Sequence, residues 1–107
     1  MSTPKQLHGE PFQVTATHAT AASASKAVAT GKVHYITDAS ASSDKAGAIL
    51  LIKDGTTVIW QVQMGANGSV NLHFVQPLKG TSGAAVSVDV DGTSACKANI
   101  AGFTVKQ

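Results

Sequence analysis

Charge is the scarcest feature of this 107-residue sequence. Only 13% of its residues are Asp, Glu, Lys or Arg, whereas a typical soluble protein contains about 25%. The basic residues are scattered, without a Lys/Arg block or a basic stripe interleaved with aromatic side chains, so nucleic-acid binding has little support. A surface so poor in charge repels its neighbours weakly, which favours a chain that packs against other chains. The alternative is a monomer with a surface coated by Ser and Thr.

Paired cysteines and long apolar runs are also missing. The single cysteine, Cys96, cannot form an internal disulfide, so the fold does not depend on oxidation. There is no run of about 18 apolar residues that could span a membrane, and the first residues lack the apolar segment of a signal peptide. We therefore expect no membrane partner, and synthesis in a cytosol.

The residues that chemistry needs stand in no recognisable arrangement. The four histidines have none of the spacings typical of metal ligands. Catalysis needs a nucleophile beside a base, or paired carboxylates in a cleft, but most of the acidic residues fall in predicted turns or near the N-terminus, where Asp has a structural role. The sequence therefore predicts no enzyme, no metal, no cofactor and no small-molecule substrate.

Alternation of apolar and polar residues dominates what is present. Phe12, Val14, Ala16 and His18 alternate with polar residues, as in a half-buried strand. About seven or eight such short runs, separated by Gly, Asp and Asn turn signals and without a helical pattern, predict an all-β antiparallel sandwich or jelly roll. Residues 12–107 form this single domain, and residues 1–11, which lack a periodic pattern, are predicted to be an extended arm or a disordered terminus.

The central segment, residues 47–74, contains the only Trp and most of the large aliphatic side chains. A two-residue turn at Asp54-Gly55 would place Leu51 opposite Val58 and Ile49 opposite Trp60. The opposite face of these strands is apolar too, so it needs a second cover from a neighbouring subunit, the first strands or the N-terminal arm. We therefore predict a subunit interface at Leu50, Ile52 and Ile59.

The other turns complete the predicted core. A three-residue loop at 65–67 aligns the apolar faces of its two flanking strands, although these strands could instead lie in different sheets, as in jelly rolls. Residues 38–45 and 76–80 are predicted loops, and residues 91–93 would join a hairpin that pairs Val88 with Cys96. The predicted core contains Ile49, Leu51, Val58, Trp60, Leu72, Phe74, Val86, Val88 and Ile100.

Several short segments resemble small virion proteins of tailed bacteriophages. They are the run 47–60, Phe74 with 77–80 and 83–86, and the closing residues 98–100 and 102–103. The resemblance covers roughly residues 28–105. It implies a jelly-roll protein that forms homotrimers on the outside of the phage head. Such cement, or decoration, proteins sit at three-fold and quasi-three-fold points and clamp neighbouring subunits of the major capsid protein.

We therefore expect a structural protein of the bacteriophage virion, located on the capsid surface. The arm is the predicted capsid contact, with candidate residues Ser2, Thr3, Pro4, Lys5, Gln6, Leu7 and Pro11. One alternative is a tail or fibre module that binds a host surface or other virion proteins. Another is an independent carbohydrate-binding domain, which would need exposed Trp or Tyr. An enzyme is the least supported hypothesis.

Overall fold

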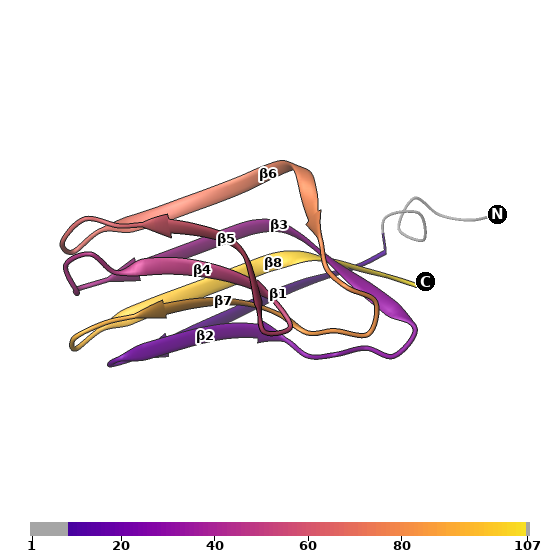
Figure 1. Cartoon of the computed structure of the whole chain (residues 1–107), viewed down its shortest axis with the longest axis horizontal. Helices are drawn as coiled ribbons and strands as arrows, with labels where there is room; N and C mark the ends of the chain where they lie inside the picture. The colour runs from indigo at the N-terminus through magenta and orange to yellow at the C-terminus, as the bar shows by residue number, and fades with distance from the viewer. Residues whose placement is uncertain (1–8, 107) are drawn as a thin grey trace.

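The computed structural model describes residues 9–106, and every regular element in this range is a β-strand (Figure 1). No helix in the described range is therefore available to span a membrane. The eight strands are β1 (Glu10–His18), β2 (Ala21–Lys26), β3 (Lys32–Ser43), β4 (Ile49–Asp54), β5 (Thr57–Gln63), β6 (Ser69–Lys79), β7 (Val86–Asp91) and β8 (Cys96–Lys106).

The strands form two four-stranded antiparallel sheets that pack face to face (Figure 1). The strand orders are β1-β8-β3-β6 and β2-β7-β4-β5. The pairings are nested, β1 with β8, β2 with β7, β3 with β6 and β4 with β5, as if one long hairpin had been wrapped around the core. This is the strand arrangement of a jelly roll, so the predicted fold class is confirmed.

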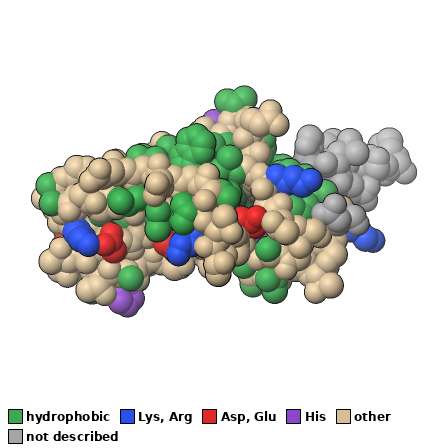
Figure 2. Space-filling view, in the orientation of Figure 1, with side chains coloured by type: hydrophobic (Ala, Val, Ile, Leu, Met, Phe, Trp, Pro, Cys, Tyr) green, Lys and Arg blue, Asp and Glu red, His purple; other side chains and the backbone are tan. Residues whose placement is uncertain are grey.

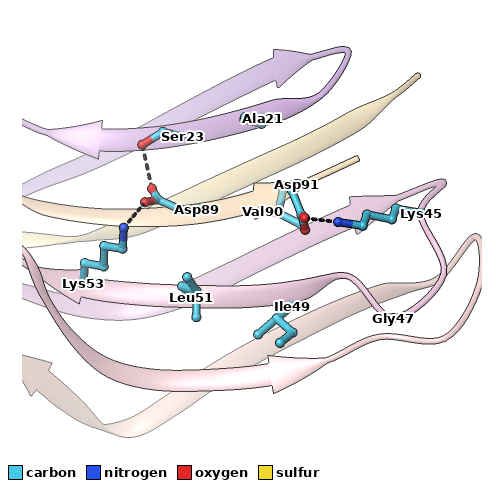
Figure 3. Close-up of a pocket in the computed structure, with 11 residues that line it drawn as sticks. Ala21, Ser23, Lys45, Gly47, Ile49, Leu51, Lys53, Asp89, Val90 and Asp91 are labelled. Atoms are coloured by element: carbon cyan, nitrogen blue, oxygen red, sulfur yellow. Dashed lines mark hydrogen bonds and ion pairs between the residues drawn. The ribbon is translucent and has the colours of Figure 1, made fainter. Parts of the chain in front are cut away.

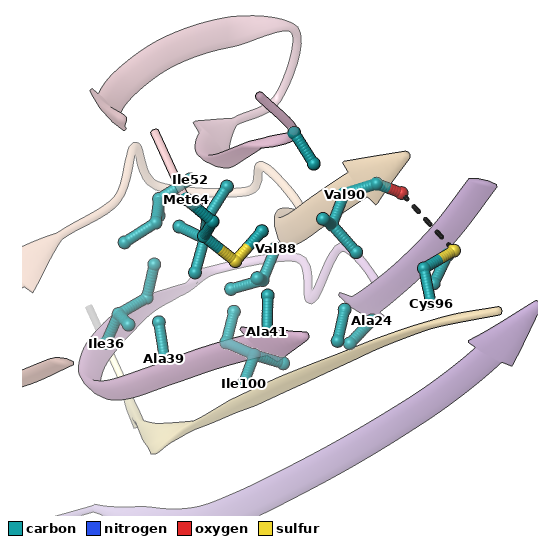
Figure 4. Close-up of a cluster of buried hydrophobic side chains, with 14 of the residues drawn as sticks. Ala24, Ile36, Ala39, Ala41, Ile52, Met64, Val88, Val90, Cys96 and Ile100 are labelled. Carbon is teal, nitrogen blue, oxygen red and sulfur yellow. Dashed lines mark hydrogen bonds between the residues drawn. The ribbon is translucent and has the colours of Figure 1, made fainter. Parts of the chain in front are cut away.

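The core lies between the two sheets and combines small and branched side chains (Figure 4). Ile36 and Ile100 point inward from one sheet toward Ile52 and Val88 of the other. Alanines such as Ala24 fill positions where the sheets approach closely. Full burial of each large aliphatic side chain contributes about 1.5–3 kcal/mol, so these residues dominate the stability of the sandwich.

Two strands are longer than predicted. β3 continues through residues 38–43, which were expected to form a loop, because Ala39 and Ala41 alternate inward and the strand pairs on both sides. β6 runs past Pro77 to Lys79. Its pairing with β3 jumps from Leu78 to His73, so Pro77 lies in a bulge of an edge strand, where its missing N–H is tolerated.

The N-terminal boundary also differs from the prediction. β1 begins at Glu10, which pairs with Thr104, so residues 10 and 11 belong to the sandwich. Pro11, predicted to contact a capsid, is exposed and pairs with Phe103. The other capsid-contact candidates, Ser2, Thr3, Pro4, Lys5, Gln6 and Leu7, lie outside the described residues.

The predicted hairpin registers are wrong, for identifiable reasons. In the β4–β5 turn Asp54 pairs with Thr57, and Gly55 takes a φ of 62° at the first central position, as a type II′ turn requires. β5 and β6 lie in different sheets, which was the alternative considered for the loop at 65–67. β7 and β8 are also in different sheets, so Val88 and Cys96 do not pair across a hairpin, although both lie in the core.

Candidate interaction surfaces

The two faces of β4 are the reverse of the prediction. Leu50 and Ile52, the proposed subunit contacts, are both 0% exposed and belong to the core of this chain. Ile49 is 39% exposed, and Leu51 is half-buried. The prediction of a second, uncovered apolar face therefore stands, but that face carries Ile49 and Leu51.

A bulge explains the reversal. Lys53 pairs with Val58 but Ile52 pairs with Trp60, so β5 contains one extra residue at this point and the register shifts. Pairing opposite Ile52 directs Trp60 toward the inner side of the sandwich. Because β5 is the outermost strand of its sheet, the indole is nevertheless 44% exposed.

The remaining predictions for this region are mixed. Val86, Val88 and Ile100 are fully buried, which confirms their place in the core. Leu72 and Phe74 pack against the core from its margin, and so does Ile59, which was expected at a subunit interface. Val58 is 44% exposed, so it is not a core residue.

The outward face of β4 forms the floor of a groove with a volume of about 510 Å³ (Figure 3). Ile49 and Leu51 supply aliphatic side chains, and Ala21 lies on the far side of the groove, on β2. Strand β7 lies between β4 and β2 and crosses the middle of the groove. Its Asp89 pairs with Leu51 of β4 on one side and with Ser23 of β2 on the other. We call this site the β4 groove.

Two ion pairs border the β4 groove (Figure 3). Lys53 Nζ lies 3.0 Å from Asp89 Oδ2, and the Ser23 hydroxyl donates a 2.6 Å hydrogen bond to the other carboxylate oxygen. Lys45 pairs with Asp91 at the other end. Each lysine charge is thus balanced by an aspartate of the same chain. The feature of the groove that still lacks a partner is its exposed apolar floor.

These contacts affect the two carboxylates. Partial burial of Asp89 opposes its ionisation, but the Ser23 hydrogen bond and the Lys53 ammonium outweigh this effect and hold its pKa below the ordinary value. The hydrogen bond from Lys45 lowers the pKa of Asp91. Both groups are therefore ionised at neutral pH, and the groove carries no net charge from these four residues.

A second apolar surface lies where the two sheets end in β5 and β6. The Trp60 and Phe74 rings meet edge to face with their centroids 5.4 Å apart, across the gap between the two edge strands. Val58 lies two residues before Trp60 on β5 and is 44% exposed, and Val75, which follows Phe74 in the bulge of β6, is 92% exposed. We call these four residues the edge patch. Figure 2 shows hydrophobic side chains interspersed among charged and other polar side chains on one face of the molecule.

The outer face of the other sheet is polar. Thr15, Asn99 and Ser40 form a hydrogen-bonded row across β1, β8 and β3. Next to this row His73 Nδ1 lies 2.8 Å from an Asp38 carboxylate oxygen, and this hydrogen bond lowers the pKa of Asp38. The short polar side chains at these positions hydrogen-bond to one another, and the face that they form is readily hydrated.

One end of the molecule is closed by a network around Asp44. Its carboxylate accepts hydrogen bonds from the Ser94 hydroxyl and from the backbone N–H groups of Thr93 and Ser94. The Ser94 and Thr93 bonds hold the pKa of Asp44 far below its ordinary value. This network ties the β3–β4 loop to the β7–β8 loop, so it has a structural role.

Residues 9–106 contain no group of three His, Cys, Asp or Glu side chains placed to hold a metal ion. The buried His34 is fully used: its Nε2–H donates to the Ala27 carbonyl at 2.7 Å, and its Nδ1 lies 2.7 Å from the Thr104 hydroxyl. Cys96 is buried beside Val90.

The residues around the β4 groove were not identified from the sequence as a site. The alternation of Ile49, Leu51 and Lys53 places all three on one face, and the alternation of Asp89 and Asp91 does the same for β7. Only the pairing of β4 with β7, which are far apart in the chain, brings these two rows together. No protein-family model matches this chain, and a search of curated proteins finds no match either.

Proposed function

We propose that this chain is a structural virion protein, a homotrimeric cement protein that binds the major capsid protein on the outer surface of a bacteriophage head. The observation that carries the proposal is the uncovered apolar face of β4, with Ile49 and Leu51 in the floor of the β4 groove. A half-exposed aliphatic row in a sheet is stabilised when another surface covers it. The low charge of the chain favours such a contact.

The phage assignment rests on the sequence resemblance, and each apolar surface includes residues of the segments that carry it. The segment 47–60 includes the groove residues Ile49 and Leu51 and the patch residue Trp60, and Phe74 belongs to the next segment. The resemblance covers 28–105, which extends over the sandwich from the β2–β3 loop to the end of β8. It therefore includes the floor of the β4 groove and the whole edge patch, but not the side of the groove on β2.

The proposed mechanism is mechanical. Each trimer holds several capsid subunits at once, and binding to the assembled lattice but not to free subunits stabilises the assembled state. Each contact is modest, but contacts linked within one trimer reinforce each other, because the second and third binding events become intramolecular. In this proposal the N-terminal residues 2–11 supply the contact with the capsid.

Electron cryomicroscopy of the virion that contains this protein tests the proposal. The expected result is jelly-roll density in groups of three at three-fold and quasi-three-fold positions of the capsid. Density for this chain on the tail alone would reject the cement role and favour a tail or fibre module. A tagged copy labelled with gold provides a control for the assignment of the density.

A further inference from the structure

We infer that the edge patch of one copy docks into the β4 groove of the next copy, so that identical head-to-tail contacts close the trimer. This inference rests on the proposed function, since it names the surfaces by which the proposed trimer forms. The occupant of the groove is thus a second copy of this chain.

The distribution of exposed apolar side chains supports this pairing. Five large hydrophobic residues of the described chain are exposed, and four of them belong to the two surfaces: Val58, Trp60 and Val75 to the edge patch and Ile49 to the groove. The two surfaces contain different residues but lie on neighbouring strands, since Val58 of the edge patch pairs with Lys53, which lines the groove. A contact of patch with groove covers both surfaces, whereas a two-fold contact limited to the two patches leaves Ile49 and Leu51 open.

Charge is compatible with the same pairing. The groove has two lysines and two aspartates, and each lysine is already paired with an aspartate of its own chain. It offers no unbalanced charge, so it suits an uncharged occupant. The edge patch has no charged residue, and its Trp60 and Val75 side chains present apolar surface to the solvent. A cavity of about 510 Å³ falls within the range of about 300–1,000 Å³ that accepts groups of this size.

The composition of β5 gives independent support. Exposed edge strands are normally protected against pairing by charged residues, proline or bulges. Of the four edge strands, β1 contains Glu10 and Pro11, β2 ends with Lys26, and β6 contains Pro77. β5 has a bulge near Val58 but neither a charged residue nor a proline from Thr57 to Gln63. The bulge is thus the only one of these devices in β5, and a neighbouring copy can cover the rest of this edge.

A head-to-tail contact makes a specific prediction about mixed variants. Val75→Asp damages only the patch and Ile49→Asp damages only the groove, so each variant alone should lose the trimer and have the mass of one 10.8 kDa chain. In an equimolar mixture the intact patch of the Ile49→Asp chain meets the intact groove of the Val75→Asp chain. This single contact cannot close a ring, so a dimer of the two variants should form.

Analytical ultracentrifugation with one variant labelled by a fluorophore measures these masses. Val28→Asp is the matched control, because Val28 is also a large exposed hydrophobic residue, at 63%, but belongs to neither surface. This control should remain trimeric. Thermal unfolding of every variant, followed by circular dichroism, establishes that each one is folded.

The possible failures are distinguishable. If the wild-type chain is trimeric and Ile49→Asp remains trimeric, the groove is not the docking site and the inference is wrong, although the proposed trimer stands. If Val75→Asp alone disrupts association, the contact is between two patches, which also overturns the inference. A wild-type chain that is monomeric even at millimolar concentration would instead reject the trimer of the proposed function.

Discussion

At the scale of single residues, Gly102 shows how closely two strands approach in this sandwich. It lies in β8 between Phe12 of β1 and Ile36 of β3. A Cβ atom at this position would lie 1.9 Å from the Tyr35 carbonyl oxygen, a backbone atom that cannot move away easily. Glycine is therefore required here by space, next to the irregularity that interrupts β3 between Ile36 and Asp38.

Gly102→Ala is expected to lower the free energy of unfolding by about 2 kcal/mol or more, because the new methyl group forces the backbones of β3 and β8 apart. Chemical denaturation followed by circular dichroism measures the effect. Gly65→Ala is the matched control: nothing lies within 4 Å of its added methyl group, so a change below about 0.5 kcal/mol is expected. Equal midpoints for the two variants would contradict the close approach.

At the scale of the element, β4 is a strand with two apolar faces, only one of which is covered by the rest of the chain. Its inner face packs against β3 and β8 through the core, and its outer face is open in the β4 groove. Adjacent leucines at positions 50 and 51 therefore have the same chemistry but different surroundings. They offer a direct test of which face is inside.

Leu50→Ala is expected to cost about 2–5 kcal/mol of unfolding free energy, since it leaves a cavity in the core. Leu51→Ala should cost about 1 kcal/mol or less, because its side chain is only half-buried. Both should be measured by urea denaturation at a concentration at which the chain is monomeric. Similar losses for the two variants would mean that the faces are assigned incorrectly.

At the scale of the whole molecule, four aspartates share an electrostatic property that acts on stability together. The pKa values of Asp38, Asp44, Asp89 and Asp91 are all lowered from the ordinary 3.8, mainly by hydrogen bonds from neighbouring side chains. The folded state therefore binds fewer protons than the unfolded state in acid. Their stabilising contribution is complete above the unfolded pKa and is lost as the pH falls through the folded values.

We therefore expect the midpoint of urea unfolding to be nearly constant between pH 7 and pH 5 as far as these groups are concerned, and to fall clearly by pH 3. Asp89→Asn should show a smaller fall between pH 5 and pH 3 than the wild type, because one of the four titrating groups is missing. Stability that is unchanged or higher at pH 3 would contradict the assignment of these hydrogen bonds.

Local sequence patterns account for much of this architecture. The alternation in β1 and β7, the turn signals and the lack of a helical pattern were sufficient to predict an antiparallel sandwich, because each depends on neighbouring residues only. The surplus of apolar faces in the segment 47–60 was also evident. Ala22 and Ala24 were missed as core residues, since alanine gives little signal of burial without knowledge of the opposing sheet.

The sequence by itself determined that this chain is an all-β sandwich with one apolar face too many, because strand periodicity and composition are local properties. Only the tertiary structure decided which face that is. A single-residue bulge in β5 and the partition of β5 and β6 between two sheets set the register, and a shift by one residue exchanges the two faces of a strand. The β4 groove exists for the same reason, because it needs β4 beside β7, a pairing between distant segments that no local pattern specifies.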